Sequence, residues 1–150
     1  MQKYRTLLVR ESLSKDFDRA FNQTIDEHAK VYEIMKLLNA DMQLEEHSWV
    51  VHLNSAQNDT GVTEVSIGSL DRAIVNPAEV FRTAILSGAA AIVLVHNHPS
   101  GDTTPSNDDI VTTRRLVEAG RVIGIPVIDH LVIGANGYTS LAEIDISLFL

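Results

Sequence analysis

Hydrophobic residues recur at two spacings along this chain, and the two spacings separate its predicted helices from its predicted strands. Between Asp26 and Asn39 they recur at helical spacing, after a Thr24–Glu27 pattern that is typical of a helix cap. The segments 48–54 and 62–67 alternate instead between apolar and polar residues, and a turn-rich stretch separates them. These two segments therefore predict a β-hairpin.

Two further helices are predicted from their start signals. Asn76 can cap a helix and the proline after it suits the first helical turn, so a helix is expected from there to about Gly88. Ser106 is the start of a second cap pattern, and the helix behind it is expected to end at Gly120.

Short apolar segments between and after these helices predict the remaining strands. Residues 90–96 are almost wholly apolar, as in a buried strand, and residues 127–133 and 138–141 flank a glycine-rich turn. Residues 4–9 could form one more strand. The mixed order of elements predicts an α/β or α+β fold, with a mixed sheet and helices packed on it.

Composition and charge narrow the class of protein. The chain has 150 residues, of which 45% are hydrophobic, and this suits one domain with its own core. It has no cysteine, so disulfides and thiolate metal ligands are excluded, and its charged N-terminal residues do not resemble a secretory signal. No apolar run approaches the roughly 20 residues of a membrane helix. We therefore expect a cytoplasmic protein without a membrane partner.

The net charge of −8 argues against direct binding to nucleic acid, because the phosphate backbone repels an acidic surface. A local basic patch would be needed to overcome this repulsion. The only adjacent basic pair is Arg114–Arg115. No nucleic-acid partner is therefore expected.

Candidate metal ligands follow the predicted buried strand. His96 and His98 are two residues apart, so both imidazoles can face the same way at a strand end. A loop rich in proline and glycine leads from them to Asp109 in the first turn of the next helix. Two imidazoles and one carboxylate suit a zinc-like ion and leave a fourth position for water. The residues alone also allow buried, hydrogen-bonded histidines and an ordinary cap pair of Ser106 and Asp109.

The run from His96 to Asp109 resembles the JAMM motif of MPN/JAB domains: His-x-His, seven residues, Ser, two residues, Asp. Its HNHPSGDTTPS sequence resembles the RadC branch of that family in particular. Thr104, Ser69 and Ala78 depart from the branch's usual residues. The resemblance implies an MPN/JAB-like, cytidine-deaminase-like three-layer sandwich in a single domain over residues 1–150, with residues 1–24 as an N-terminal extension and residues 25–143 as the core.

The resemblance also implies the roles of the site residues. His96, His98 and Asp109 would ligate one zinc ion per chain. Ser106 would donate a hydrogen bond to a developing oxyanion or position the attacking water, beside its role as a helix cap. The chain would be a short, stand-alone form without the helix-hairpin-helix region of full-length RadC proteins.

A hydrolase of this type needs a glutamate that takes a proton from water. Glu46, which directly precedes the first hairpin strand, resembles the family's glutamate best, and Glu64 on the second hairpin strand is the alternative. Glu79 is interpreted as a helix-cap residue and Glu45 as a solvated neighbour. Three histidines are interpreted as structural: His28, His47 and His52. For His130 two interpretations stay open, a partner of the site together with Asp129 or a strand residue with a satisfied hydrogen bond.

The expected function is that of a zinc-dependent metallopeptidase or isopeptidase that acts on an unidentified protein or peptide. The alternative is a non-catalytic interaction module in DNA repair or in a mobile element. A nuclease is disfavoured, because the contiguous His-Asn-His differs from the dispersed residues of HNH nucleases. The apolar tail 144–150 could pack on the core or pair with a second chain, so a homodimer is possible.

Overall fold

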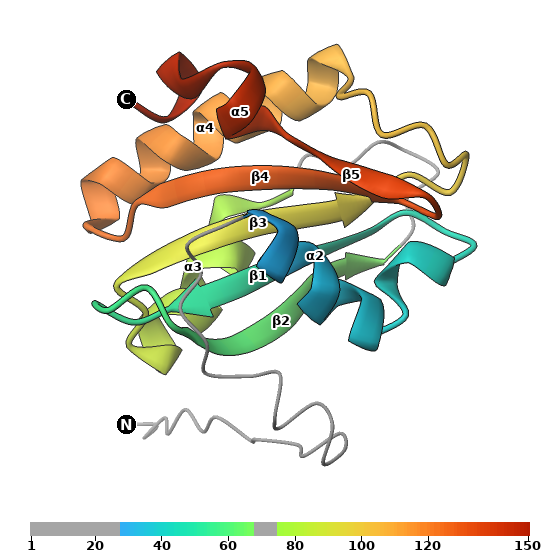
Figure 1. The fold of residues 1–150 in the computed structure, drawn as a ribbon. Helices are drawn as coiled ribbons and strands as arrows, with labels where there is room; N and C mark the ends of the chain where they lie inside the picture. Colours follow the sequence, from blue (N-terminus) through green and yellow to red (C-terminus); the bar gives the residue numbers. More distant parts are fainter. Residues whose placement is uncertain (1–27, 68–74) are drawn as a thin grey trace, which may run out of the picture.

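The computed structural model describes residues 28–67 and 75–150, and its centre is a five-stranded sheet in the order β2-β1-β3-β4-β5 (Figure 1). Strands β3 and β4 run parallel, and every other neighbouring pair is antiparallel. The bounds of the strands are β1 His47–Leu53, β2 Asp59–Ile67, β3 Ala91–Asn97, β4 Val127–Gly134 and β5 Gly137–Ser140. The predicted mixed sheet is thus confirmed.

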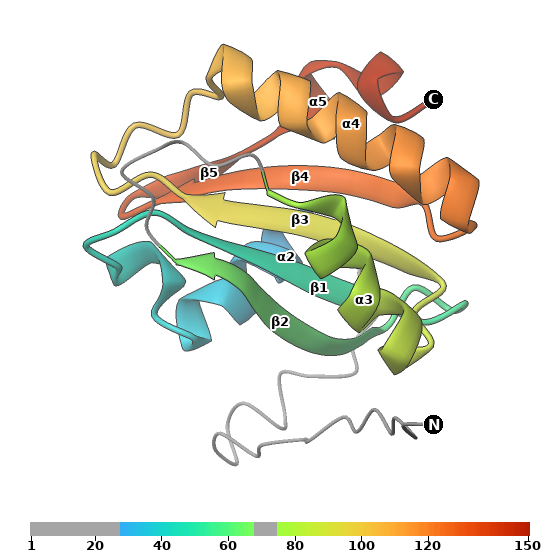
Figure 2. The same cartoon turned by 180° about the vertical axis from the view of Figure 1, so that it is seen from behind.

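Helices cover both faces of this sheet. Helix α2 (His28–Leu37) packs on one face, and helices α3 (Pro77–Ser87) and α4 (Asn107–Ile123) pack on the other (Figure 2). The short elements are η1 (Ala40–Met42), α5 (Leu141–Ile144) and η2 (Ile146–Phe149). The predicted sandwich of helix, sheet and helix layers is therefore confirmed. No helix in the described ranges is both long and apolar enough to cross a bilayer.

The alternation of side chains along the two central strands divides the core. Val51 of β1 and Val93 of β3 pack on the α2 side, whereas Val50 and Leu94 pack on the side of α3 and α4. Both strands are buried on both faces over most of their length, although only β3 has the nearly continuous apolar sequence that such burial favours. The same alternation fixes which way each residue at the end of β3 points.

Three predicted boundaries are wrong. Helix α4 continues past Gly120 to Ile123, and Gly124 ends it with a positive φ of 84°. Position 120 lies inside the helix and requires glycine, because a Cβ there would come within 2.6 Å of the Ile125 carbonyl oxygen. Strand β2 begins earlier than predicted, at Asp59, whose side chain is buried. Leu141 belongs to α5 rather than to β5, because Ser140 caps that helix.

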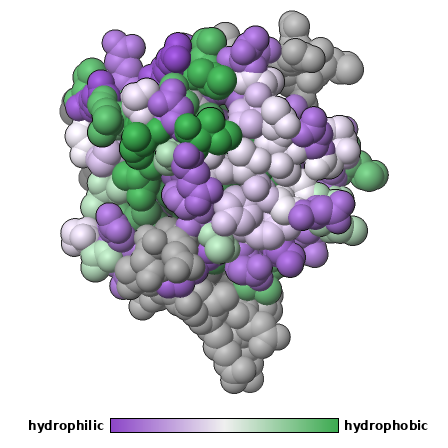
Figure 3. All heavy atoms as spheres, turned by 45° about the horizontal axis from the view of Figure 1, so that its top comes forward, coloured by the Kyte–Doolittle hydropathy of each residue, from purple (hydrophilic) through white to green (hydrophobic). Residues whose placement is uncertain are grey.

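Part of the tail packs on the core, which is one of the two expectations for it. Leu148 is buried against β4 and α5, whereas Ile146 and Leu150 are exposed. Figure 3 shows hydrophobic side chains gathered on one part of the face that carries α4 and α5 in Figure 1. Whether a second chain pairs here stays a prediction. The possible strand 4–9, the extension 1–24, the Thr24–Glu27 cap pattern and Ser69 lie outside the described residues.

Candidate metal centre

The end of strand β3 presents its polar residues to opposite faces of the sheet. His96 and His98 point to the side of α4, and Asn97 between them points to the side of α2. His96 is only 3% exposed because β1 and β4 pair with β3 on either side. A strand that is apolar up to its last residues thus delivers two imidazoles to one place.

The first turn of helix α4 supplies the carboxylate. The Ser106 hydroxyl accepts from the Asp109 backbone N–H at 3.2 Å, and the Ser106 backbone N–H donates to Asp109 Oδ2 at 2.6 Å. This reciprocal cap fixes the carboxylate at the helix start. The Ser106 hydroxyl also donates to Oδ2, at 2.7 Å, so Asp109 Oδ2 receives two hydrogen bonds from one residue.

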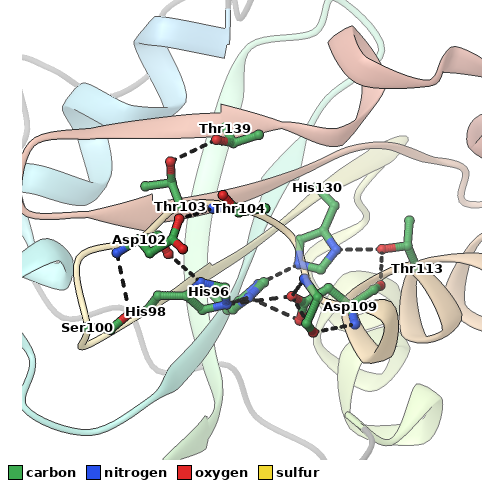
Figure 4. Close-up of polar contacts among 11 residues, drawn as sticks. His96, His98, Ser100, Asp102, Thr103, Thr104, Asp109, Thr113, His130 and Thr139 are labelled. Atoms are coloured by element: carbon green, nitrogen blue, oxygen red, sulfur yellow. Dashed lines mark hydrogen bonds and ion pairs between the residues drawn. The ribbon is translucent and has the colours of Figure 1, made fainter.

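The side chains of His96, His98 and Asp109 converge on one point (Figure 4). The Nε2 atoms of His96 and His98 are 3.0 Å apart, and Asp109 oxygens lie 3.2 Å from His96 Nε2 and 3.5 Å from His98 Nε2. Among the described residues this is the one group of three or more ligand-type side chains whose ligand atoms all lie within 4.8 Å of one another. Two imidazole nitrogens and a carboxylate oxygen at this spacing fit a single divalent transition-metal ion.

The charges in the group favour an ionised Asp109. Burial raises the pKa of this carboxyl, but hydrogen bonds from His96 and His98 outweigh burial and hold the pKa well below its usual range. The hydrogen bond to Asp109 raises the pKa of His98, and the negative charge of Glu46 raises it further. Asp109 is therefore in the ionised form that a metal ligand requires.

The second nitrogen of each imidazole has its own partner. His98 Nδ1 donates to the Asp102 carbonyl oxygen at 2.6 Å, and His96 Nδ1 lies 2.8 Å from His130 Nε2 on β4. Burial lowers the pKa of His130 to about 3, so this ring is neutral. Of the two interpretations of His130, the structure supports direct contact with the site. Thr113, which hydrogen-bonds His130, is absent from the sequence prediction, although its place four residues after Asp109 was a usable signal.

Strand pairing places Glu46 beside the predicted ligands. Ser48 of β1 pairs antiparallel with His96 of β3, and Glu46 lies near enough to His98 for its charge to raise the pKa of that ring. Glu46, His96, His98, Ser106 and Asp109 all line one cavity of about 370 Å³. Its apolar wall includes Trp49, Leu94 and Leu116. The structure thus brings the predicted base and the predicted ligands into one cavity.

The other glutamates lie elsewhere. Glu64 hydrogen-bonds His47 Nδ1, and neither Glu64, Glu45 nor Glu79 is among the residues that line the cavity. Helix α3 is capped by the Asn76 side chain, which accepts from the Ala78 backbone N–H. The geometry therefore favours Glu46 over Glu64 as the residue near the three ligand-type side chains.

The remaining histidines bond away from the cavity. His28 on α2 pairs with Asp129, whose side chain faces the α2 side and also accepts from Ser140. Asp129 therefore does not join His130 at the site. His52 is buried between the hydroxyls of Thr63, at 2.9 Å, and Ser87, at 3.2 Å. These contacts agree with the structural interpretation of both histidines.

Comparison with known proteins places the whole fold and the site in one family. A model of the RadC-like JAB domain matches residues 25–146. A UPF0758 protein of Moorella thermoacetica is 55% identical over 93 residues, which cover 62% of this chain and 41% of that protein. A UPF0758 protein of Symbiobacterium thermophilum is 50% identical over 113 residues, 75% of this chain and 48% of that protein. The chain spans about half the length of the curated relatives it matches.

Proposed function

We propose that this chain, which belongs to the family of RadC-like JAB domains, is a zinc-dependent hydrolase of amide bonds in proteins or peptides. The observation that carries the proposal is the convergence of His96, His98 and Asp109 in a cavity that Glu46 also lines. Three protein ligands of this kind leave one coordination position for water or substrate, as in catalytic zinc sites.

His96, His98 and Asp109 would hold the zinc ion, which when bound polarises a carbonyl group and lowers the pKa of water. Glu46 would accept the proton of the attacking water and return it to the leaving amine. Its place in the cavity that the three predicted ligands line supports this assignment, because a general base must lie within hydrogen-bond reach of the water it deprotonates.

Ser106 would have two tasks at this site. Its hydroxyl has a single proton, and in the structure that proton is donated to Asp109 Oδ2. To stabilise an oxyanion the hydroxyl must turn this proton toward the substrate, while the Ser106 backbone N–H keeps its own hydrogen bond to Asp109. The cap and the oxyanion contact can thus be made by different groups of one residue.

Metal content and hydrolysis together test the proposal. Inductively coupled plasma mass spectrometry should find one zinc ion per chain in the purified protein. The His96→Ala variant should lose this zinc ion. A panel of peptides and isopeptide-linked conjugates should be cleaved by the wild type and not by Glu46→Gln, which should still bind zinc. Glu45→Gln is the matched control, because Glu45 is adjacent in sequence but does not line the cavity.

Full activity in Glu46→Gln would overturn the assignment of the base. A wild-type protein without zinc and without hydrolysis would favour the alternative function, a non-catalytic interaction module in DNA repair or in a mobile element. Co-purification with repair proteins under those conditions would support that alternative directly.

A further inference from the structure

His130 connects a predicted metal ligand to helix α4. It is buried in β4, with its Nε2 2.8 Å from His96 Nδ1 and its Nδ1 2.6 Å from the Thr113 hydroxyl oxygen. The Thr113 hydroxyl lies 2.6 Å from the backbone carbonyl oxygen of Asp109. A chain of three hydrogen bonds therefore leads from one predicted ligand to the backbone of another (Figure 4).

The direction of these hydrogen bonds follows from the groups themselves. A carbonyl oxygen can only accept, so the Thr113 hydroxyl donates its single proton to Asp109. The hydroxyl oxygen must then accept from His130 Nδ1, and the unprotonated Nε2 of His130 accepts from His96 Nδ1. With Nδ1 of His96 as the donor to His130, Nε2, the atom that faces Asp109 and His98, is the nitrogen left to bind a metal ion.

We propose that His130 and Thr113 are positioning residues that hold His96 in the tautomer and ring orientation needed for metal binding, and that tie this ligand to Asp109 through the backbone of α4. The inference rests on the proposed function, because it takes the three-residue site to bind zinc. It goes beyond it by assigning a role to two residues that are neither predicted ligands nor the predicted base, of which His130 also lines the cavity. Partners of this kind typically change metal affinity 10–100-fold when they are replaced.

His52 is a second buried histidine in this sheet, and it serves as a control because it does not hydrogen-bond a predicted metal ligand. His52 on β1 also bonds two hydroxyls, those of Thr63 and Ser87, but its ring contacts no predicted ligand. His52 and His130 are both nearly inaccessible to solvent, 2% and 5% exposed. Their replacement should therefore perturb core packing comparably, and only His130 should affect the metal.

The test measures zinc affinity by competition with a chromophoric chelator, and the tautomer of His96 by nitrogen-15 NMR of the zinc-free protein. Thr113→Val removes the hydroxyl and keeps the shape of the side chain, and His130→Phe removes the acceptor for His96. Both variants should bind zinc about 10–100-fold more weakly and should lose the hydrogen-bonded Nδ1–H of His96. His130→Gln, which keeps one acceptor and one donor, should restore part of the affinity, and His52→Gln should leave affinity and tautomer unchanged.

The outcomes separate this inference from the proposed function. If the wild type binds one zinc ion and both Thr113→Val and His130→Phe bind it equally tightly, the positioning role is wrong and the proposed function stands. If the wild type binds no zinc, both fall. Should His130→Phe fail to fold, Thr113→Val and His130→Gln decide the question, since each keeps the core filled.

Discussion

Asn97 holds Glu45 from the opposite side of the sheet: its side-chain Nδ2 donates to the Glu45 carbonyl oxygen at 2.9 Å. The Oδ1 of the same side chain accepts from the His47 backbone N–H at 2.7 Å. Asn97, which lies between His96 and His98, thus hydrogen-bonds the residue before Glu46 and the residue after it. The end of strand β3 therefore presents His96 and His98 on one face of the sheet. On the other face its Asn97 holds the segment that contains the predicted base.

Replacement of Asn97 should disturb the position of Glu46 and leave metal binding largely unchanged. Asn97→Ala leaves a carbonyl and an N–H of the Glu46 segment without partners, and we expect the free energy of unfolding to fall by about 2 kcal/mol. Hydrolysis should fall because Glu46 is no longer held, whereas zinc affinity should change less than about threefold, because His96 and His98 point the other way. Denaturant unfolding and zinc titration check this.

Asn54→Ala is the control for Asn97→Ala. The Asn54 side chain also accepts from backbone N–H groups, those of Ala56 and Asn58, but in the hairpin turn between β1 and β2. It should lower stability without an effect on hydrolysis. Loss of zinc in Asn97→Ala to the extent seen in His96→Ala would contradict the expected separation.

Removal of the Ser106 hydroxyl should affect both the helix and the metal. Ser106→Ala loses the cap of α4, which costs about 0.5–2 kcal/mol of stability, and frees Asp109 Oδ2 from one of its hydrogen bonds. We expect weaker zinc binding together with the loss of stability. Asn76→Ala removes the cap of α3 in the same way, and calorimetric unfolding should show a similar cost with unchanged zinc affinity. Equal zinc affinity in the two variants would show that the Ser106 hydroxyl makes no contribution to metal binding.

Gly120→Ala should destabilise the protein although alanine is the better helix former. The new Cβ would lie 2.6 Å from the Ile125 carbonyl oxygen and 3.3 Å from Phe81, and overpacking of this kind costs about 1–3 kcal/mol. Val122→Ala, at an exposed position of the same helix, should change stability by less than about 0.5 kcal/mol. Thermal unfolding of the two variants measures the difference, and a more stable Gly120→Ala protein would rule out the close approach.

The buried His52 should make stability fall in mild acid. Burial lowers its pKa to about 4 in the folded chain, whereas the unfolded chain takes up a proton near pH 6.5. Because the unfolded state binds more protons between these values, the contribution of His52 is complete above about pH 6.5 and is lost as the pH falls toward 4, up to about 3 kcal/mol. Urea unfolding between pH 7 and pH 4 should show a shallower decline in His52→Gln. An unchanged slope would contradict the neutral, buried state of this ring.

The sequence predicted what depends on local spacing and left open what depends on the register between distant strands. The alternation in β1 and the cap at Ser106 are local, and both are present as expected. The contact of His96 with His130 arises because Leu94 pairs with His130 in the parallel β3–β4 ladder, which brings His130 to the face that His96 shares with Leu94. No local pattern specifies that pairing. The mistaken helix end at Gly120 has a similar cause, since only the packing against Ile125 and Phe81 explains a glycine inside the helix.

The predicted ligands all belong to one continuous stretch, residues 96–109. Glu46 comes from a separate segment, directly before strand β1. Capture of the cation and transfer of the proton are therefore assigned to separate pieces of chain, which mutation can alter independently. On the proposed function, a single change at position 46 would remove hydrolysis and keep the metal site. One substitution would thus turn the proposed hydrolase into a metal-binding scaffold.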